Sequence, residues 1–203
     1  MLIAIEGITG IGKSTLQSLF CQRYKAEAIT QEFEKNPYLA WSHAQPGRCD
    51  LEREAIFLFM AYHQLANANT FGSLVFSDFF LDKLTVFAST CLSGSELEDL
   101  YYPCFRFLRS RLRNPDLIIR LIGSPEFALS NIRRRNRDTE ASITEGYLRK
   151  LDQAFDNLFY EYRGCDVITV DAEESNLVFN PREIQRLNTL IEQKLPDILA
   201  FRS

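Results

Sequence analysis

The segment 7–14, within the stretch "IEGITGIGKST", constrains this chain more than any other. It fits the pattern G-x-x-x-x-G-K-[ST], follows an apolar run at 2–6, and precedes a run with helical spacing at 13–24. Glycines let backbone N–H groups turn inward around phosphate oxygens, and the positive end of the following helix adds to the attraction. We therefore predict a nucleotide-phosphate loop made of Gly7, Ile8, Thr9, Gly10, Ile11, Gly12, Lys13, Ser14 and Thr15.

Two side chains of this loop have separate tasks. In the motif, the lysine reaches the β- and γ-phosphates and the hydroxyl residue ligates Mg²⁺, so we expect these roles for Lys13 and Ser14. A glycine-rich turn without a ligand is the simpler alternative. That alternative gives no reason for the lysine.

Strands and helices are predicted to alternate along the chain. Apolar runs typical of strands lie at 2–6, within 27–33, at 72–78, 114–123 and 165–172, with helical patterns between them. The second of these strands is expected to end near Glu32. Such alternation predicts a parallel sheet with helices on both faces. The sequence has no repeat and no low-complexity linker, so we expect a single domain over 1–203.

Composition argues against several classes of partner. The chain carries 23 Lys and Arg against 27 Asp and Glu, so no broad basic surface for nucleic acid is expected. Its apolar runs are too short for a signal peptide or a membrane span. The five cysteines are scattered without metal-ligand spacing and are predicted to be free thiols. We therefore expect a cytoplasmic protein with no membrane and no nucleic-acid partner.

A run of arginines lies well downstream of the phosphate loop. Arg133, Arg134, Arg135 and Arg137 occupy four of five consecutive positions. Such a run is usually a solvated face when it stands alone. Behind a phosphate loop it predicts a lid, at about 133–142, because phosphoryl transfer needs cations over the moving group.

Acidic residues follow two of the predicted strands. Glu32 and Glu34 come after the second strand, and Asp78 ends the third. Carboxylates at strand ends lie on the ligand side of an open α/β sheet, where Asp78 would hold Mg²⁺ directly or through water. Either glutamate could instead be merely solvated. The simplest expectation for Asp82 and Lys83 is that they pair with each other.

These stretches together resemble one family, the deoxynucleoside kinases, particularly the bacterial deoxyadenosine and deoxyguanosine kinase branch of the P-loop kinases. The resemblance covers nearly the whole chain and rests on "IEGITGIGKST", "QEFEKNPYL", "SDFFLDKLTVFA", "PDLIIRLIGSPEFALSNIRRRNRDTE", "YLRKLDQAF" and "VITVDAEE". It implies the P-loop NTPase fold with a five-stranded parallel sheet, an arginine-rich lid and a homodimer. The implied reaction moves the γ-phosphoryl group of ATP, with Mg²⁺, onto the 5′-hydroxyl of a deoxynucleoside.

The resemblance also implies roles for single residues. The family's general base falls on Glu32, and its lid arginines fall on Arg135 and Arg137. The lid glutamate that contacts the sugar 3′-hydroxyl falls on Glu140. The aromatic ring that stacks on the base falls on Phe87.

The chain departs from the family in the pocket for the acceptor. The segment Ser77-Asp78-Phe79 lacks the arginine of the family's acid-Arg-Ser triplet. Glu54 stands in place of a base-reading glutamine, and Ala61 in place of an arginine. His43 matches a tyrosine that holds the 3′-hydroxyl, and Lys83 matches an aspartate.

These departures leave the choice of substrate open. An amide offers a donor and an acceptor, whereas an ionised glutamate offers acceptors only, so Glu54 would favour a base edge rich in donors or bind a cation. The alternative is that Glu54 faces solvent.

Three functions are compatible with the sequence. They are a deoxynucleoside kinase, a P-loop kinase for another small acceptor such as a nucleoside monophosphate, and a nucleotide-binding interaction or regulatory subunit that has lost catalysis. The phosphate loop, Glu32 and the lid favour the first two. The missing arginine and the changed pocket favour the third.

Overall fold

The computed structural model describes residues 1–45, 47–68, 72–92, 94–137, 140–175 and 180–201, without the side chains of Ala40, His43 and Ala44. Five strands form one parallel sheet in the order β2-β3-β1-β4-β5. They are β1 (Leu2–Glu6), β2 (Glu27–Ile29), β3 (Val75–Ser77), β4 (Leu117–Ile122) and β5 (Asp166–Asp171). The five-stranded parallel sheet is therefore confirmed.

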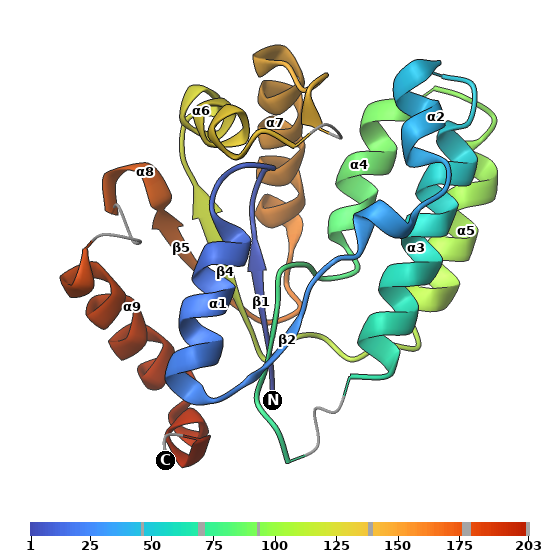
Figure 1. Ribbon diagram of the computed structural model, residues 1–203. Helices are drawn as coiled ribbons and strands as arrows, with labels where there is room; N and C mark the ends of the chain where they lie inside the picture. The colour runs from blue at the N-terminus through green and yellow to red at the C-terminus, as the bar shows by residue number, and fades with distance from the viewer. Residues whose placement is uncertain (46, 69–71, 93, 138–139, 176–179, 202–203) are drawn as a thin grey trace.

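Helices lie on both faces of this sheet (Figure 1). They are α1 (Lys13–Tyr24), α2 (Leu39–Ala44), α3 (Asp50–Ala66), α4 (Lys83–Cys91), α5 (Glu98–Arg109), α6 (Pro125–Arg135), α7 (Glu145–Glu161), α8 (Ala172–Ser175) and α9 (Pro181–Lys194). Short 3₁₀ helices lie at Phe33–Lys35 and Pro196–Phe201. Helices α3, α4 and α5 form a group of their own beside the sheet.

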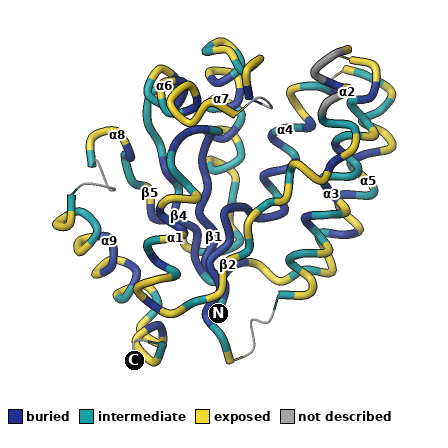
Figure 2. The backbone as a smooth tube through the Cα atoms, in the orientation of Figure 1, coloured by how far each residue is buried: buried dark blue, intermediate teal, exposed yellow. Residues whose placement is uncertain are grey.

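The central strands are buried on both faces, which explains why they read as unbroken apolar runs (Figure 2). Ile3 and Ile5 of β1 point into the main core, where they meet Phe20 of α1. Ala4 points the other way and packs with Phe80 and the end of α7. The strand that leads into the phosphate loop is thus fixed from both sides.

The α3–α4–α5 group has a separate core. Leu58 of α3, Leu84 of α4, and Tyr101 and Phe105 of α5 are buried together there. This packing holds α3 and α4 against each other beside the sheet. The two helices can therefore form the far wall of a cavity.

Three local features differ from the expectation. Strand β2 ends at Ile29 rather than near Glu32, because Asp78 takes over the next backbone N–H group, that of Gln31, at 2.9 Å. Helix α2 was not predicted, since its six residues are too few to show a helical period. Helix α5 begins at Glu98 with Leu97 as its N-cap residue, although the stretch "SGSELED", with serine ahead of acidic residues, predicts a serine cap.

The carboxyl ends of the parallel strands meet at one edge of the sheet. The phosphate loop (7–15) follows β1, Gln31 lies two residues beyond β2, Asp78 follows β3, and α6 follows β4. None of the helices in the described ranges is long and apolar enough to cross a bilayer. All five cysteines are free thiols, as expected.

Candidate active site

At two positions of the phosphate loop, both the backbone φ angle and the lack of room for a Cβ atom require glycine. Gly7 has a φ of 143° and Gly10 a φ of 89°. A Cβ on Gly7 would come within 2.3 Å of the Leu121 carbonyl oxygen, and one on Gly10 within 2.4 Å of that of Ala128. The loop therefore has to be backbone alone at these points, where it turns between β1 and α1.

The Lys13 ammonium lies inside this loop. It donates hydrogen bonds to the carbonyl oxygens of Gly7 at 2.7 Å and Ile8 at 3.0 Å. Burial, followed by the charge of Lys83, lowers the pKa of Lys13 to about 8. Phosphate oxygens would compensate this buried charge better than the two carbonyl groups do.

Glu6, the last residue of β1, is a buried acid directly below the loop. Its carboxylate accepts hydrogen bonds from the backbone N–H of Phe80 at 2.8 Å and of Gly7 at 3.3 Å. Burial raises the pKa of Glu6 to about 7, and the charges of Lys83 and Lys13 oppose that rise. Sequence reasoning missed Glu6, although a charged residue that ends an apolar strand was a usable signal.

Ser14 and Asp78 meet at the mouth of the loop, as their predicted metal roles require. The Ser14 hydroxyl donates to Asp78 Oδ2 at 3.1 Å, and the Gln31 backbone N–H donates to Asp78 Oδ1 at 2.9 Å. Hydroxyl and carboxylate oxygens are the ligands that Mg²⁺ prefers, usually together with phosphate oxygens and water. The pair therefore fits Mg²⁺. Within the described ranges, no three His, Cys, Asp or Glu side chains form a metal cluster.

One cavity of about 1000 Å³ joins the phosphate loop to the inner faces of α3 and α4. Most of the predicted site residues line it, namely Thr9, Gly10, Ile11, Gly12, Lys13, Ser14, Thr15, Glu54, Asp78, Phe87, Arg135, Arg137 and Glu140. Gly7 and Ile8 lie deeper and contribute carbonyl oxygens to Lys13. The chain thus brings residues from five separate stretches to one space.

Glu32 is placed differently from the other predicted residues. Its carboxylate forms an ion pair with Lys35 at 2.7 Å, and its side chain is 46% exposed. Its neighbours Gln31 and Phe33 line the cavity, whereas Glu32 is absent from the lining. The side chain of His43, the other predicted substrate contact in this region, lies outside the described residues.

The lid begins where α6 ends. Asn136 adopts a left-handed conformation with a φ of 48° and stops the helix just after Arg135. The Arg135 guanidinium binds both oxygens of Glu140, at 2.8 Å and 2.7 Å. Arg137 lies over the ring of Phe33, 5.7 Å from its centroid. Positions 138–139 of the predicted lid lie outside the described residues.

Glu54 lies at the opposite end of the cavity and is only 3% exposed, so the expectation that it faces solvent is wrong. Its Oε1 accepts a hydrogen bond from Arg53 Nε at 2.8 Å, while its buried Oε2 has no partner among the described residues. Arg53 also pairs with Asp50 at 3.0 Å. Burial raises the pKa of Glu54, and the Arg53 charge opposes the rise.

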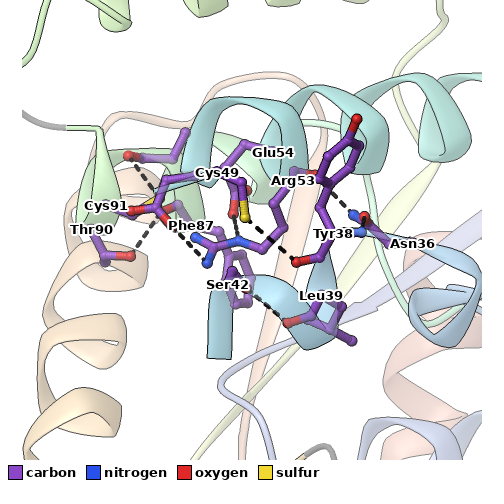
Figure 3. Close-up of polar contacts among 12 residues, drawn as sticks. Asn36, Tyr38, Leu39, Ser42, Cys49, Arg53, Glu54, Phe87, Thr90 and Cys91 are labelled. Atoms are coloured by element: carbon purple, nitrogen blue, oxygen red, sulfur yellow. Dashed lines mark hydrogen bonds and ion pairs between the residues drawn. The ribbon is translucent and has the colours of Figure 1, made fainter. Parts of the chain in front are cut away.

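Figure 3 shows Arg53 and Glu54 on α3, with Phe87, Thr90 and Cys91 of α4 close to them. The Cys91 thiol, which lies near the Glu54 carboxylate, donates to the Phe87 carbonyl oxygen at 3.3 Å. Because that thiol donates to backbone carbonyl groups, the second oxygen of Glu54 accepts no hydrogen bond of normal geometry from the described residues, although Cys91 lies close to it.

The expected Asp82–Lys83 pair is absent from the described ion pairs. Asp82 instead pairs with Arg109 of α5 at 2.6 Å, on the outer side of α4. Lys83 is the next residue along the helix, where the direction of the side chain has turned by about 100°. It therefore points inward and lines the cavity, with 5% of its surface exposed.

Asn131 is a further residue that sequence reasoning missed. Its side-chain amide donates to the Gly10 carbonyl oxygen at 3.0 Å and so ties α6 to the phosphate loop. Because it lies within an ordinary helical pattern, no local signal marked it. The contact sets the distance between the loop and the lid arginines, which follow on the same helix.

Comparison with known proteins agrees with this geometry. A sequence model of the family "Deoxynucleoside kinase" matches residues 3–196. Deoxyguanosine kinase of Bacillus subtilis is 29% identical over 94% of this chain and 96% of its own length. Deoxyadenosine/deoxycytidine kinase of the same bacterium is 22% identical over 97% and 94%.

Among solved structures, deoxyadenosine kinase from M. mycoides with bound dATP has a TM-score of 0.78 and 22% identity. The match covers 93% of this chain and all of that one, and it supports the P-loop NTPase fold. The family match over nearly the whole length, together with the phosphate loop and the lid on one cavity, leads to one conclusion. The chain belongs to the deoxynucleoside kinase family.

Proposed function

We propose that the protein transfers the γ-phosphoryl group of ATP to the 5′-hydroxyl of a deoxynucleoside. The observation that carries this proposal is the single cavity that has a phosphate loop and cationic lid at one end and the buried Glu54 and Phe87 at the other. Such a cavity suits a donor and an acceptor held end to end. Family membership favours this reaction over the other two candidate functions.

In the proposed reaction, the acceptor 5′ oxygen bonds to the γ-phosphorus as the bond from that phosphorus to the bridging oxygen of ADP breaks. The loop amides and Lys13 would hold the β- and γ-phosphates in line with the acceptor. Arg135 and Arg137 would lie over the moving group and offset its spreading charge. The hydroxyl proton leaves to a carboxylate.

We assign that proton to Glu32, which has to turn away from Lys35 to reach the cavity. An exposed ion pair of this kind stabilises a protein by only about 0–1 kcal/mol, so releasing it costs little. The flanking residues Gln31 and Phe33 already line the cavity, which supports a rotation of the side chain without movement of the chain. Asp78 is the nearest competitor, but it is already bonded to Ser14 and Gln31.

Ser14 and Asp78 are the residues that would hold Mg²⁺ in this proposal. The ion would neutralise charge on the phosphates. Its predicted ligands are already within hydrogen-bond distance of each other, so little rearrangement is needed.

The acceptor would place its sugar near Glu140 and its base between Phe87 and Glu54. The free Oε2 of Glu54 favours a base with N–H donors at the facing edge. Guanine offers two adjacent donors, adenine and cytosine offer an exocyclic amine, and thymine offers carbonyl groups around one N–H. His43, the cytoplasmic location and the homodimer remain predictions of the sequence.

A substrate screen tests the proposal. The purified protein is incubated with ATP, Mg²⁺ and each of the four deoxynucleosides, and the products are identified by mass spectrometry. We expect a deoxynucleoside monophosphate, most from the amine-bearing bases and least from thymidine. The Lys13→Ala variant should make none, and Glu54→Gln should narrow the gap to thymidine, since an amide can also donate.

Other outcomes identify the rival functions. Phosphorylation of nucleoside monophosphates alone would indicate a kinase for another acceptor. Binding of ATP without any product would indicate a nucleotide-binding subunit. A preference for thymidine would show that Glu54 does not read the base.

A further inference from the structure

Lys83 is a buried ammonium without a hydrogen-bond or ion-pair partner among the described residues. Its side chain lines the cavity and is 5% exposed. Its ammonium lies over two aromatic rings, with Nζ 5.7 Å from the ring centroid of Phe79 and 5.8 Å from that of Phe87. The rings offset only part of the cost of removing an ammonium from water.

The acids close to Lys83 do not serve as its partners. The charge of Lys83 opposes the rise in the pKa of Glu6 caused by burial, and it does so more than the charge of Lys13. The Glu6 carboxylate is nevertheless bonded to the backbone N–H groups of Phe80 and Gly7. Asp82, the adjacent acid in the sequence, pairs with Arg109 instead. The Lys83 ammonium is therefore held beside the phosphate loop with a buried acid near it, but with no ion pair or hydrogen bond among the described residues.

Most other cations of the cavity already have partners. Arg53 is bonded to Glu54 and Asp50, and Arg135 is bonded to Glu140. Lys13 is held by carbonyl groups of the loop. Arg137 also contacts only a ring, that of Phe33, but it is exposed. Within the described cavity lining, Lys83 is thus a buried cation with no ion pair or hydrogen bond of its own.

The position of Lys83 indicates what kind of anion its ammonium would bind. Lys83 and Lys13 both line the cavity, and the charge of Lys83 lowers the pKa of Lys13, so the two ammonium groups lie in the same part of that cavity. Lys83 also lies under Phe87, one turn further along α4 on the side where the acceptor is expected. These two relations put its ammonium between the donor phosphates and the acceptor.

We propose that Lys83 is a second phosphate-binding lysine, which contacts the phosphoryl group during its transfer from ATP to the acceptor hydroxyl. This rests on the proposed function. The lysine takes no part in proton transfer, while the bonds to phosphorus form and break as described above and the hydroxyl proton leaves to a carboxylate. A cation fixed in this place offsets the charge on the phosphoryl oxygens without having to reorganise.

The kinetic test compares Lys83→Met, Lys83→Arg and Lys150→Met, the last being an exposed lysine on α7 that serves as the matched control. We expect Lys83→Met to lower kcat by about 10²–10³. Lys83→Arg keeps the charge and should recover most of the loss. Lys150→Met should behave as the parent protein does.

Stability separates this role from a structural one. If the Lys83 ammonium serves to bind phosphate, its burial destabilises the protein when no phosphate is bound. The Lys83→Met variant should therefore have the same melting temperature as the parent protein or a higher one. A lysine needed for folding would give the opposite result. A lower melting temperature that falls together with the rate, and that Lys83→Arg does not restore, overturns the proposal.

A binding test needs no catalysis and so distinguishes failure of this inference from failure of the proposed function. Titration calorimetry with inorganic tripolyphosphate should show binding about tenfold weaker to Lys83→Met than to the parent protein or Lys150→Met. Equal affinity in all three proteins refutes the inference, even if the parent protein phosphorylates deoxynucleosides. Weaker binding supports it, even if no deoxynucleoside is accepted.

Discussion

Lys13 is the residue whose ionisation should control binding of the phosphate donor. Burial, and next the charge of Lys83, lowers its pKa to about 8, so in the free protein it loses its proton as the pH rises through that value. Only the protonated form offsets phosphate charge. We therefore expect kcat/KM for ATP, which reports the free enzyme, to fall as the pH rises through about 8. A value that stays constant to well above this pH would contradict the assignment.

Glu32 is the residue whose role depends on a change of side-chain position. Glutamine keeps its shape but cannot accept a proton, so Glu32→Gln should lower kcat by about 10²–10⁴. Binding of the deoxynucleoside and the melting temperature should hardly change, because the Lys35 pair is exposed. Glu34→Gln is the matched control. Unchanged turnover in Glu32→Gln would transfer the role of the base to Asp78.

At the residue scale, functional residues could be predicted from the sequence where they lie next to one another in the chain. The phosphate loop could be predicted because its glycines, Lys13 and Ser14 lie within one short segment. Glu6 was missed although its place at the end of an apolar strand was a signal, whereas Lys83 could not be assigned, since its role depends on which way a helical turn faces after packing. Glu54 was identified by position, but its burial followed only from the contact between α3 and α4.

At the scale of elements, α6 and the lid that follows it contain an arginine, Arg135, that should affect both catalysis and stability. Arg135 is bonded to Glu140, which is buried. Arg135→Ala should therefore lower kcat strongly and also remove up to about 1 kcal/mol from the free energy of unfolding, since the pair is partly exposed. The measurements are steady-state kinetics and urea denaturation.

The control for this variant is Arg133→Ala, because Arg133 lies on the same helix, is exposed and does not line the cavity. It should change neither quantity. If Arg135→Ala lost several times more stability than expected with no greater loss of rate than Arg133→Ala, the arginine would be structural.

At the scale of elements, long periodic segments were predicted well and short ones were not. Helix α1 has the expected range, and β1 and β4 are buried strands as predicted. Helix α2 and the early end of β2 were missed. The six residues of α2 are too few to show a helical period, and the early end of β2 depends on the bond from Gln31 to Asp78 rather than on a local pattern.

For the whole molecule, the alternation of strands and helices predicts which loops converge. Parallel strands put their carboxyl ends at one edge, so the loops after β1 and β3 and the lid after β4 meet there. The far wall of the cavity did not follow from this rule. It depends on how α3, α4 and α5 pack against one another, and in the proposed function this wall would select the base of the acceptor.

The central claim is direct transfer between two ligands in one cavity, and labelled ATP tests it most directly. The protein is given Mg²⁺, ATP with oxygen-18 in its γ-phosphoryl group, and the deoxynucleoside that it phosphorylates best. Phosphorus NMR should show the label in a deoxynucleoside 5′-monophosphate, and the analogue without the 5′-hydroxyl should stay unmodified. Release of the label as free phosphate, or its transfer to that analogue, would contradict the account.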